Sequence, residues 1–190
     1  MSSSLSSSRV TDAPTPAELA GLWDIDTEAG SVEFRARHFF LFPVSGRIPV
    51  GAGAVQIDDG GTLRGLDISL TAADFNTGNP GRDRQVTGPG FLDAERHPVI
   101  RFTGERLNGG GAAGWTVTGR LTVKGAGVPL TLHVDPGGIE TKDGGARVVV
   151  RATADVDRHA LGVSAMRGLV GPRLRVRVTA VFVRGVQGGV

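Results

Sequence analysis

The stretch "SVEFRARHFF", residues 31–40, decides how the rest of this chain is interpreted. Its side chains alternate between apolar and charged, with Val32, Phe34 and Ala36 set against Glu33, Arg35 and Arg37. A period of two is typical of a β-strand with one face in water and one face buried. The buried face continues to His38 and is followed by two phenylalanines. The fold therefore depends on what this face packs around.

Four further stretches show the same alternation. They are "LRGLDISL" from Leu63, "WTVTGRLTVKG" from Trp115, "VPLTLHVD" from Val128 and "RLRVRVTAVFV" from Arg173. Less regular runs at 44–57, 98–107 and 146–157 bring the predicted total to eight or nine strands. The strands are separated by turn signals such as Asp59-Gly60-Gly61, Asn108-Gly109-Gly110 and Asp143-Gly144-Gly145. The 30 glycines in 190 residues, against the usual ~7%, also indicate frequent turns or tight bends.

One long insertion interrupts the strands, at "FNTGNPGRDRQVTGPGFLDAERHP", residues 75–98. Asn79 is a suitable N-cap, Pro80 suits the first helical position, and Gly88-Pro89 suits a helix end. The sequence therefore predicts an all-β fold, an antiparallel eight-stranded barrel with a short helical crossover near residues 79–97. Closing the sheet removes its edges and leaves an interior that holds either its own side chains or one small ligand.

The length of 190 residues suits one domain, which we place at residues 15–186. Residues 1–14 are rich in serine and are expected to be a disordered tail. The stretch "TPAELAG" from Thr15 predicts at most a turn or two of helix, capped by Thr15 and Glu18. The N-terminal segment has no apolar core of a signal peptide, and no apolar run could span a bilayer. We therefore expect a cytoplasmic protein.

The composition argues against several classes of function. Cysteine is absent, and the four histidines show no HxH or HExxH spacing, so neither a metal site nor a thiolate nucleophile is expected. The stretch "GVSAM" from Gly162 lacks the second glycine of a nucleophile elbow, and no nucleotide-binding motif is present. The sequence predicts no enzyme activity and no cofactor. It also predicts no nucleic-acid binding, because most of its ten aromatic residues lie on apolar strand faces or in the crossover segment.

Positive charge gathers near the C-terminus, although the formal net charge is only +2. No acidic residue follows Asp157, whereas six arginines do, namely Arg158, Arg167, Arg173, Arg175, Arg177 and Arg184. Two interpretations remain open, a solvated strand face or a contact with an anionic surface.

Several motifs together resemble the YceI family over roughly residues 21–184. They are "WDID" from Trp23, "SVEFRARH" from Ser31, Gly46-Arg47, "TGN" from Thr77, Arg82-Asp83, "FLD" from Phe91, "HPVIRF" from His97, "GRLTVKG" from Gly119, "PLTL" ending at Leu132 and "DRHALG" from Asp157. The resemblance implies a lipocalin-like barrel whose apolar cavity binds polyisoprenoid lipids, such as polyprenyl chains and isoprenoid quinones, without covalent attachment. It also suggests a homodimer. The chain departs from the family pattern at Gln85-Val86, where a His-Leu pair is usual, and at Arg173, where an acidic residue is common.

The ligand-binding residues expected from these observations are phenylalanines, arginines and one histidine. Phe34 and Phe102 lie on apolar strand faces, and Phe40, Phe42 and Phe91 lie beside or within loops that would form the cavity mouth. His38 continues the apolar face of the first strand, where a structural role and a ligand contact are equally compatible with the pattern. Arg82 and Arg158 belong to the family pattern and suit an anion, or else they pair with Asp83 or Asp157.

The function predicted from the sequence is the binding of a long apolar lipid for storage, transport or sequestration. The alternative is a filled barrel that serves as a scaffold or stress-related interaction protein and contacts a partner through its arginine-rich C-terminal strand. An enzyme that acts on a lipid ranks third.

Overall fold

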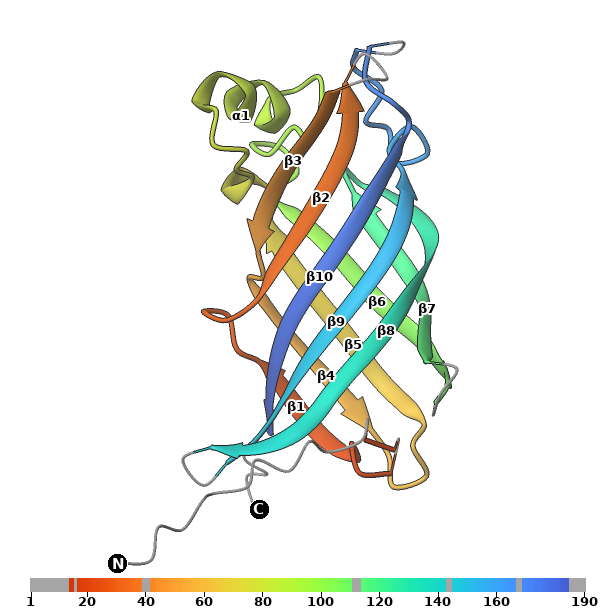
Figure 1. The fold of residues 1–190 in the computed structure, drawn as a ribbon. Helices are drawn as coiled ribbons and strands as arrows, with labels where there is room; N and C mark the ends of the chain where they lie inside the picture. Colours follow the sequence, from red (N-terminus) through yellow and green to blue (C-terminus); the bar gives the residue numbers. More distant parts are fainter. Residues whose placement is uncertain are drawn as a thin grey trace, which may run out of the picture.

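The computed structural model describes residues 14–15, 17–38, 42–110, 114–142, 145–166 and 169–184, and within these ranges the side chains of Arg37, His38, Phe42, Pro43 and Lys142 are not described. The strands are β1 (Gly21–Ile25), β2 (Ser31–His38), β3 (Phe42–Pro49), β4 (Ala52–Ile57), β5 (Leu63–Thr71), β6 (Val99–Gly109), β7 (Trp115–Val123), β8 (Ala126–Lys142), β9 (Gly145–Asp157) and β10 (Arg173–Arg184). A 3-10 turn, η1 (Ala72–Asp74), and one helix, α1 (Pro80–Thr87), lie between β5 and β6. Figure 1 shows the strands wrapped into an elongated barrel.

The barrel is antiparallel and closed, as the alternation predicted. Neighbouring strands follow the order β1-β4-β5-β6-β7-β8-β9-β10, and β10 pairs again with β1. This closed ring has eight strands, which confirms the predicted fold class. Closure leaves each of these strands with a partner on both sides, which removes the edges at which sheets aggregate.

The hairpin of β2 and β3 extends the wall beyond β1 and β4. After β1 pairs with β10 at Phe182–Arg184, β2 pairs with the same strand at Arg175–Thr179. The run predicted at 44–57 is therefore two strands, because the chain bends at Val50 and Gly51. Val50 is 2% exposed, and the Gly51 N–H donates to the Ser69 carbonyl at 2.9 Å. Burial of Val50 and this bond to β5 hold the bend in place.

The crossover helix forms where the capping signals predicted it. The Asn79 side chain accepts a hydrogen bond from the Arg82 N–H at 3.0 Å, Pro80 is the first helical residue and Gly88 is the C-cap. Beyond the helix, the Leu92 N–H donates to the Val86 carbonyl at 2.9 Å, which folds the chain back toward β6. Helix α1 thus lies beside one end of the barrel, which we call the α1 end (Figure 1).

The opposite end, which we call the β1 end, is filled by side chains. The buried cluster there comprises Leu19, Trp23, Ile25, Val50, Ile57, Trp115, Val148, Ala180 and Phe182. The indole N–H of Trp23 donates to the Leu19 carbonyl at 2.8 Å, and the Arg184 guanidinium lies 4.6 Å from the centre of the Trp23 rings. These contacts join the chain before β1 to the last strand and close this end of the barrel.

Among the described residues before β1, the chain makes one turn, which carries the predicted capping contacts. The Thr15 hydroxyl and N–H both donate to the Glu18 carboxylate, at 2.8 and 2.6 Å. These hydrogen bonds lower the pKa of Glu18 from its ordinary value. Of the expected N-terminal tail, only Pro14 lies within the described residues, and it is buried.

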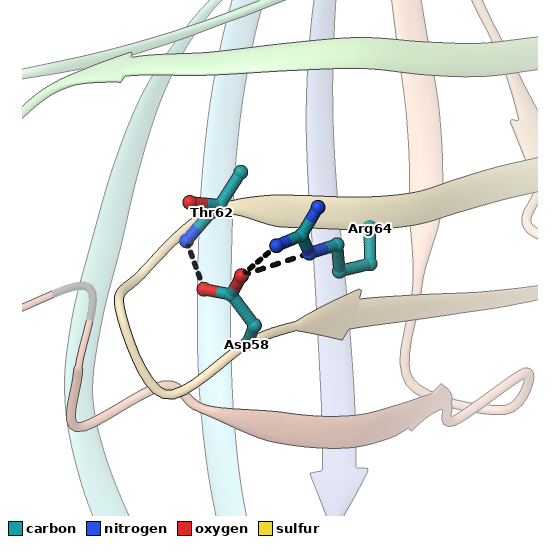
Figure 2. A network of polar contacts seen from close by, with 3 residues as sticks. All are labelled: Asp58, Thr62 and Arg64. Carbon is teal, nitrogen blue, oxygen red and sulfur yellow. Dashed lines mark hydrogen bonds and ion pairs between the residues drawn. The ribbon is translucent and has the colours of Figure 1, made fainter.

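The turn between β4 and β5 shows why the Asp59-Gly60-Gly61 signal predicted a reversal. The Asp58 carboxylate accepts from the Thr62 N–H at 2.7 Å and from the Arg64 Nε at 2.8 Å (Figure 2). Gly61, with a φ of 79°, supplies the left-handed conformation that the turn needs. The Thr62 N–H, together with Arg64, holds the pKa of the Asp58 carboxyl below its ordinary value.

Candidate functional site

A cavity of about 630 Å³ occupies the interior of the barrel toward the α1 end. Seventeen of its lining residues come from the strands, and all of them are apolar: Val32, Phe34, Ala36, Val44, Ile48, Ile68, Leu70, Ile100, Phe102, Leu121, Val123, Leu130, Leu132, Val156, Leu174, Val176 and Val178. They are the inward members of the alternating runs. The apolar face of "SVEFRARHFF" therefore lines a hollow interior as well as packing against neighbouring strands.

The wall nearest that stretch is built around one aromatic pair. The rings of Phe34 and Phe75 are stacked, with centroids 4.7 Å apart and an interplanar angle of 22°. Phe34 also faces Gly46 directly across the β2–β3 pair, where the glycine leaves room for the ring. Adding a Cβ at Gly46 would overlap the Phe34 ring and approach the Thr77 methyl group to 2.8 Å. Gly46 therefore sets the position of an aromatic side chain on the cavity wall.

The cavity reaches the surface beside α1. Asn79, Gly81 and Gln85 line it and are also exposed, so the opening lies along this helix and the residues before it. The Gln85 amide approaches the Met166 sulfur at 3.6 Å, which connects the helix with the segment after β9. The lining residues from the strands are all apolar, so the polar lining residues come from α1, the loop before it and the segment after β9.

The structure brings five of the predicted ligand-binding residues onto the same cavity. Phe34, Arg82, Phe91, Phe102 and Arg158 all line it. Phe40 and the side chains of His38 and Phe42 lie outside what the structure describes. Contact of any of these eight residues with a ligand stays a prediction.

Arg158 is held by the protein's own backbone. Its side chain is almost fully buried, with the residue 2% exposed. The guanidinium donates to the carbonyls of Gly171, Val163, Ala165 and Val170, at distances of 2.8–3.0 Å. The Asp157 carboxylate accepts from the His159 N–H at 2.8 Å. This arrangement supports a structural role for Arg158, with backbone carbonyls as partners that the sequence did not indicate.

Arg82 has different surroundings. It lies in the first turn of α1 and lines the cavity, and its Nε is buried without a hydrogen bond to any described residue. The expected partner, Asp83, accepts instead from the Thr77 N–H at 2.9 Å and from the Thr77 hydroxyl at 2.6 Å. Arg82 is thus a charged residue of the cavity lining whose Nε has no partner among the described residues.

Sequence reasoning missed several residues of the cavity wall. Phe75 and Thr77 lie in the insertion before α1, and Leu161, Val163 and Met166 lie in the segment after β9. Such residues have no periodic pattern, because they belong to turns rather than strands. The "GVSAM" stretch considered for a hydrolase supplies two of them, Val163 and Met166.

The outer surface carries the arginines of the last strand. Arg173, Arg175 and Arg177 are exposed, while Leu174, Val176 and Val178 line the cavity, as the alternation predicted. Arg175 approaches Asp155 on β9 at 3.5 Å, where both side chains are more than half exposed. This pair lies in water and adds little stability.

Two further findings concern the described part of the chain. Within it, no three His, Cys, Asp or Glu side chains lie close enough together to hold a metal ion. None of its helices has the length and apolar character needed to cross a membrane.

Comparison with known proteins agrees with this geometry. An UPF0312 protein of Pseudomonas putida (strain GB-1) is 28% identical over 100 residues, which make up 52% of each protein, so the chain spans about half the length of the curated relatives it matches. The crystal structure of Burkholderia cenocepacia BcnA superimposes with a TM-score of 0.70 at 20% identity, covering 83% of this chain and 99% of BcnA. A polyisoprenoid binding domain from Saccharophagus degradans, implicated in plant cell wall breakdown, superimposes with a TM-score of 0.64 at 14% identity. The superposition covers 86% of this chain and 98% of that domain.

The model of the YceI-like domain matches residues 23–182, a span that begins in β1 and ends in β10. The matched span therefore contains the barrel except for the first residues of β1 and the last residues of β10, together with the crossover helix and every residue of the cavity wall. With most of its length covered in this way, the chain belongs to the YceI-like family.

Proposed function

We propose that this protein binds one long apolar lipid, a polyisoprenoid or an isoprenoid quinone, for storage, transport or sequestration. The observation that carries the proposal is the cavity of about 630 Å³, whose strand-borne walls are wholly apolar. Its volume falls within the range of about 300–1,000 Å³ that is usual for small-molecule sites. The similarity to a polyisoprenoid binding domain supports the same ligand class.

Burial alone supplies the affinity that such a ligand needs. Each methylene group taken out of water contributes about 0.8 kcal/mol, so a chain that enters the cavity is held without specific polar contacts. Binding of this kind requires no reacting group. We therefore propose a binding protein rather than an enzyme.

The alternative of a filled scaffold requires an interior without room for a ligand. The β1 end meets that requirement, because Trp23, Trp115 and Phe182 are buried there. The α1 end does not, since the large cavity lies within it. The arginines of β10 face water, an environment in which they need no partner.

A tryptophan scan of β8 tests the proposal, because adjacent residues on this strand face opposite sides of the wall. Leu132 lines the cavity, and its neighbour Thr131 is exposed. We expect Leu132→Trp to reduce the lipid extracted from the purified protein, measured by mass spectrometry, and Thr131→Trp to leave it unchanged. The unfolding midpoint of Leu132→Trp should stay close to that of the wild type, because the indole enters existing space.

Two results would contradict the proposal. One is a wild-type protein that yields no lipid and binds no added geranylgeraniol. The other is a sharply destabilised Leu132→Trp variant, since overpacking a filled core typically costs about 1–3 kcal/mol. Both results together would support the filled scaffold instead of the lipid-binding protein.

A further inference from the structure

The polar groups that line the cavity are gathered at one place. They are Thr77, Asn79, Arg82 and Gln85 around α1, together with Arg158. The only charged side chains among the described lining residues are the two arginines, and no carboxylate lines the cavity. A ligand that fills this space therefore meets apolar walls along its length and a positive charge near the opening.

Of the two arginines that line the cavity, Arg82 is the one whose Nε has no hydrogen-bond partner among the described residues. The guanidinium of Arg158 is bound to four carbonyl groups of its own segment. Arg82 has a buried Nε without a hydrogen bond to a described residue, and the neighbouring carboxylate of Asp83 is engaged by Thr77. Burial of a polar group without a partner is unfavourable, and a guanidinium binds carboxylates and phosphates through paired hydrogen bonds.

We propose that the polar end of the ligand is an anion, a carboxylate or a phosphate monoester, and that it binds to the Arg82 guanidinium at the α1 end. This inference rests on the proposed lipid-binding function and narrows its ligand class to acidic lipids, which leaves out the isoprenoid quinones. The ligand is a single-chain acidic lipid, with its chain directed toward Phe102 and Leu132 and its head beside α1. At about 30 Å³ for each water-sized group, a volume of about 630 Å³ accommodates roughly 20 heavy atoms of chain.

Calorimetric titration of the delipidated 190-residue chain tests this with two pairs of probes that differ only at the head. Oleic acid is compared with oleyl alcohol, and geranylgeranyl phosphate with geranylgeraniol. We expect the acidic member of at least one pair to bind about tenfold more tightly or better, as a charge-assisted hydrogen bond allows. The pair with the larger difference shows whether the natural head is a carboxylate or a phosphate.

The same titrations on two variants assign the effect to Arg82. Arg82→Gln should remove the advantage of the acid and leave binding of the alcohol unchanged. Arg84→Gln is the matched control, because Arg84 lies on the same helix, is exposed and does not line the cavity. It makes the same change in net charge and should alter neither affinity.

Each other result overturns a defined part of the argument. If acids and alcohols bind equally to the wild type, the anionic head is wrong while the lipid cavity stands. If no probe binds, the proposed function itself fails. If the Arg82→Gln variant still binds acids more tightly than alcohols, the assignment to Arg82 is wrong. It is also wrong if the variant loses affinity for acids and alcohols alike.

Discussion

Arg82 and Arg158 line the same cavity, yet the structure surrounds them with different partners. Arg158 donates to four carbonyls between Val163 and Gly171, so it acts as the centre around which the segment after β9 is folded. A buried donor or acceptor that loses its partner costs about 1–3 kcal/mol, and hydrogen bonds to charged groups are the stronger ones. Loss of Arg158 would leave several acceptors unpaired at once.

We expect Arg158→Met to lower the free energy of unfolding by about 3 kcal/mol or more, measured by urea denaturation. Arg106→Met is the control, because Arg106 lies exposed on β6; its effect should stay within about 0.5 kcal/mol. An Arg158→Met protein of normal stability that has lost its retained lipid would contradict the structural role. It would instead support the ligand contact predicted from the sequence.

At this scale, the sequence singled out two arginines that line the cavity, but it did not indicate the contacts that each one makes. Four partners of Arg158 are backbone carbonyls, and every residue carries such a group, so no side-chain pattern could point to them. Asp83, the expected partner of Arg82, is engaged by Thr77 instead, a contact between α1 and the loop before it that spacing alone does not predict.

The strands themselves were well predicted from the sequence, because one face of each is buried and the other is solvated. On β10, Arg175 and Arg177 face water while Val176 lines the cavity between them. The interpretation of the glycines was incomplete, since several lie within strands rather than in turns. Gly46 on β3 lies against the ring of Phe34, and Gly119 on β7 lies against the ring of Phe102. Such cross-strand contacts depend on register, which a single sequence does not show.

A methyl group added to β3 tests this use of glycine. We expect Gly46→Ala to destabilise the protein by about 1–3 kcal/mol, because the Phe34 ring and Thr77 must both move. The displaced ring would enter the cavity and reduce the retained lipid. Gly65→Ala on β5 is the control, since a Cβ there meets no atom within 4 Å; it should be neutral or stabilising by about 0.5–1 kcal/mol. Equal unfolding midpoints for the two variants would contradict this account of Gly46.

The whole barrel is asymmetric along its axis. Trp23, Trp115 and Phe182 fill the β1 end, whereas the walls toward the α1 end surround open volume. The sequence predicted inward apolar faces along both halves but not which half is hollow, because that depends on where large side chains meet across the barrel. The filled end makes the cavity a pocket of fixed depth rather than a channel.

A pocket of fixed depth predicts a limit on useful chain length. Each methylene that enters adds about 0.8 kcal/mol, and the volume of about 630 Å³ accommodates roughly 20 heavy atoms at about 30 Å³ each. We expect affinity to rise from geraniol through farnesol to geranylgeraniol and to gain little more with solanesol, whose remaining units stay outside beside α1. Titration of the delipidated protein with these four alcohols measures the trend, and Leu132→Trp should reach its plateau at a shorter chain. A steady gain in affinity up to solanesol would mean that the aromatic side chains at the β1 end move apart to admit the longer chain.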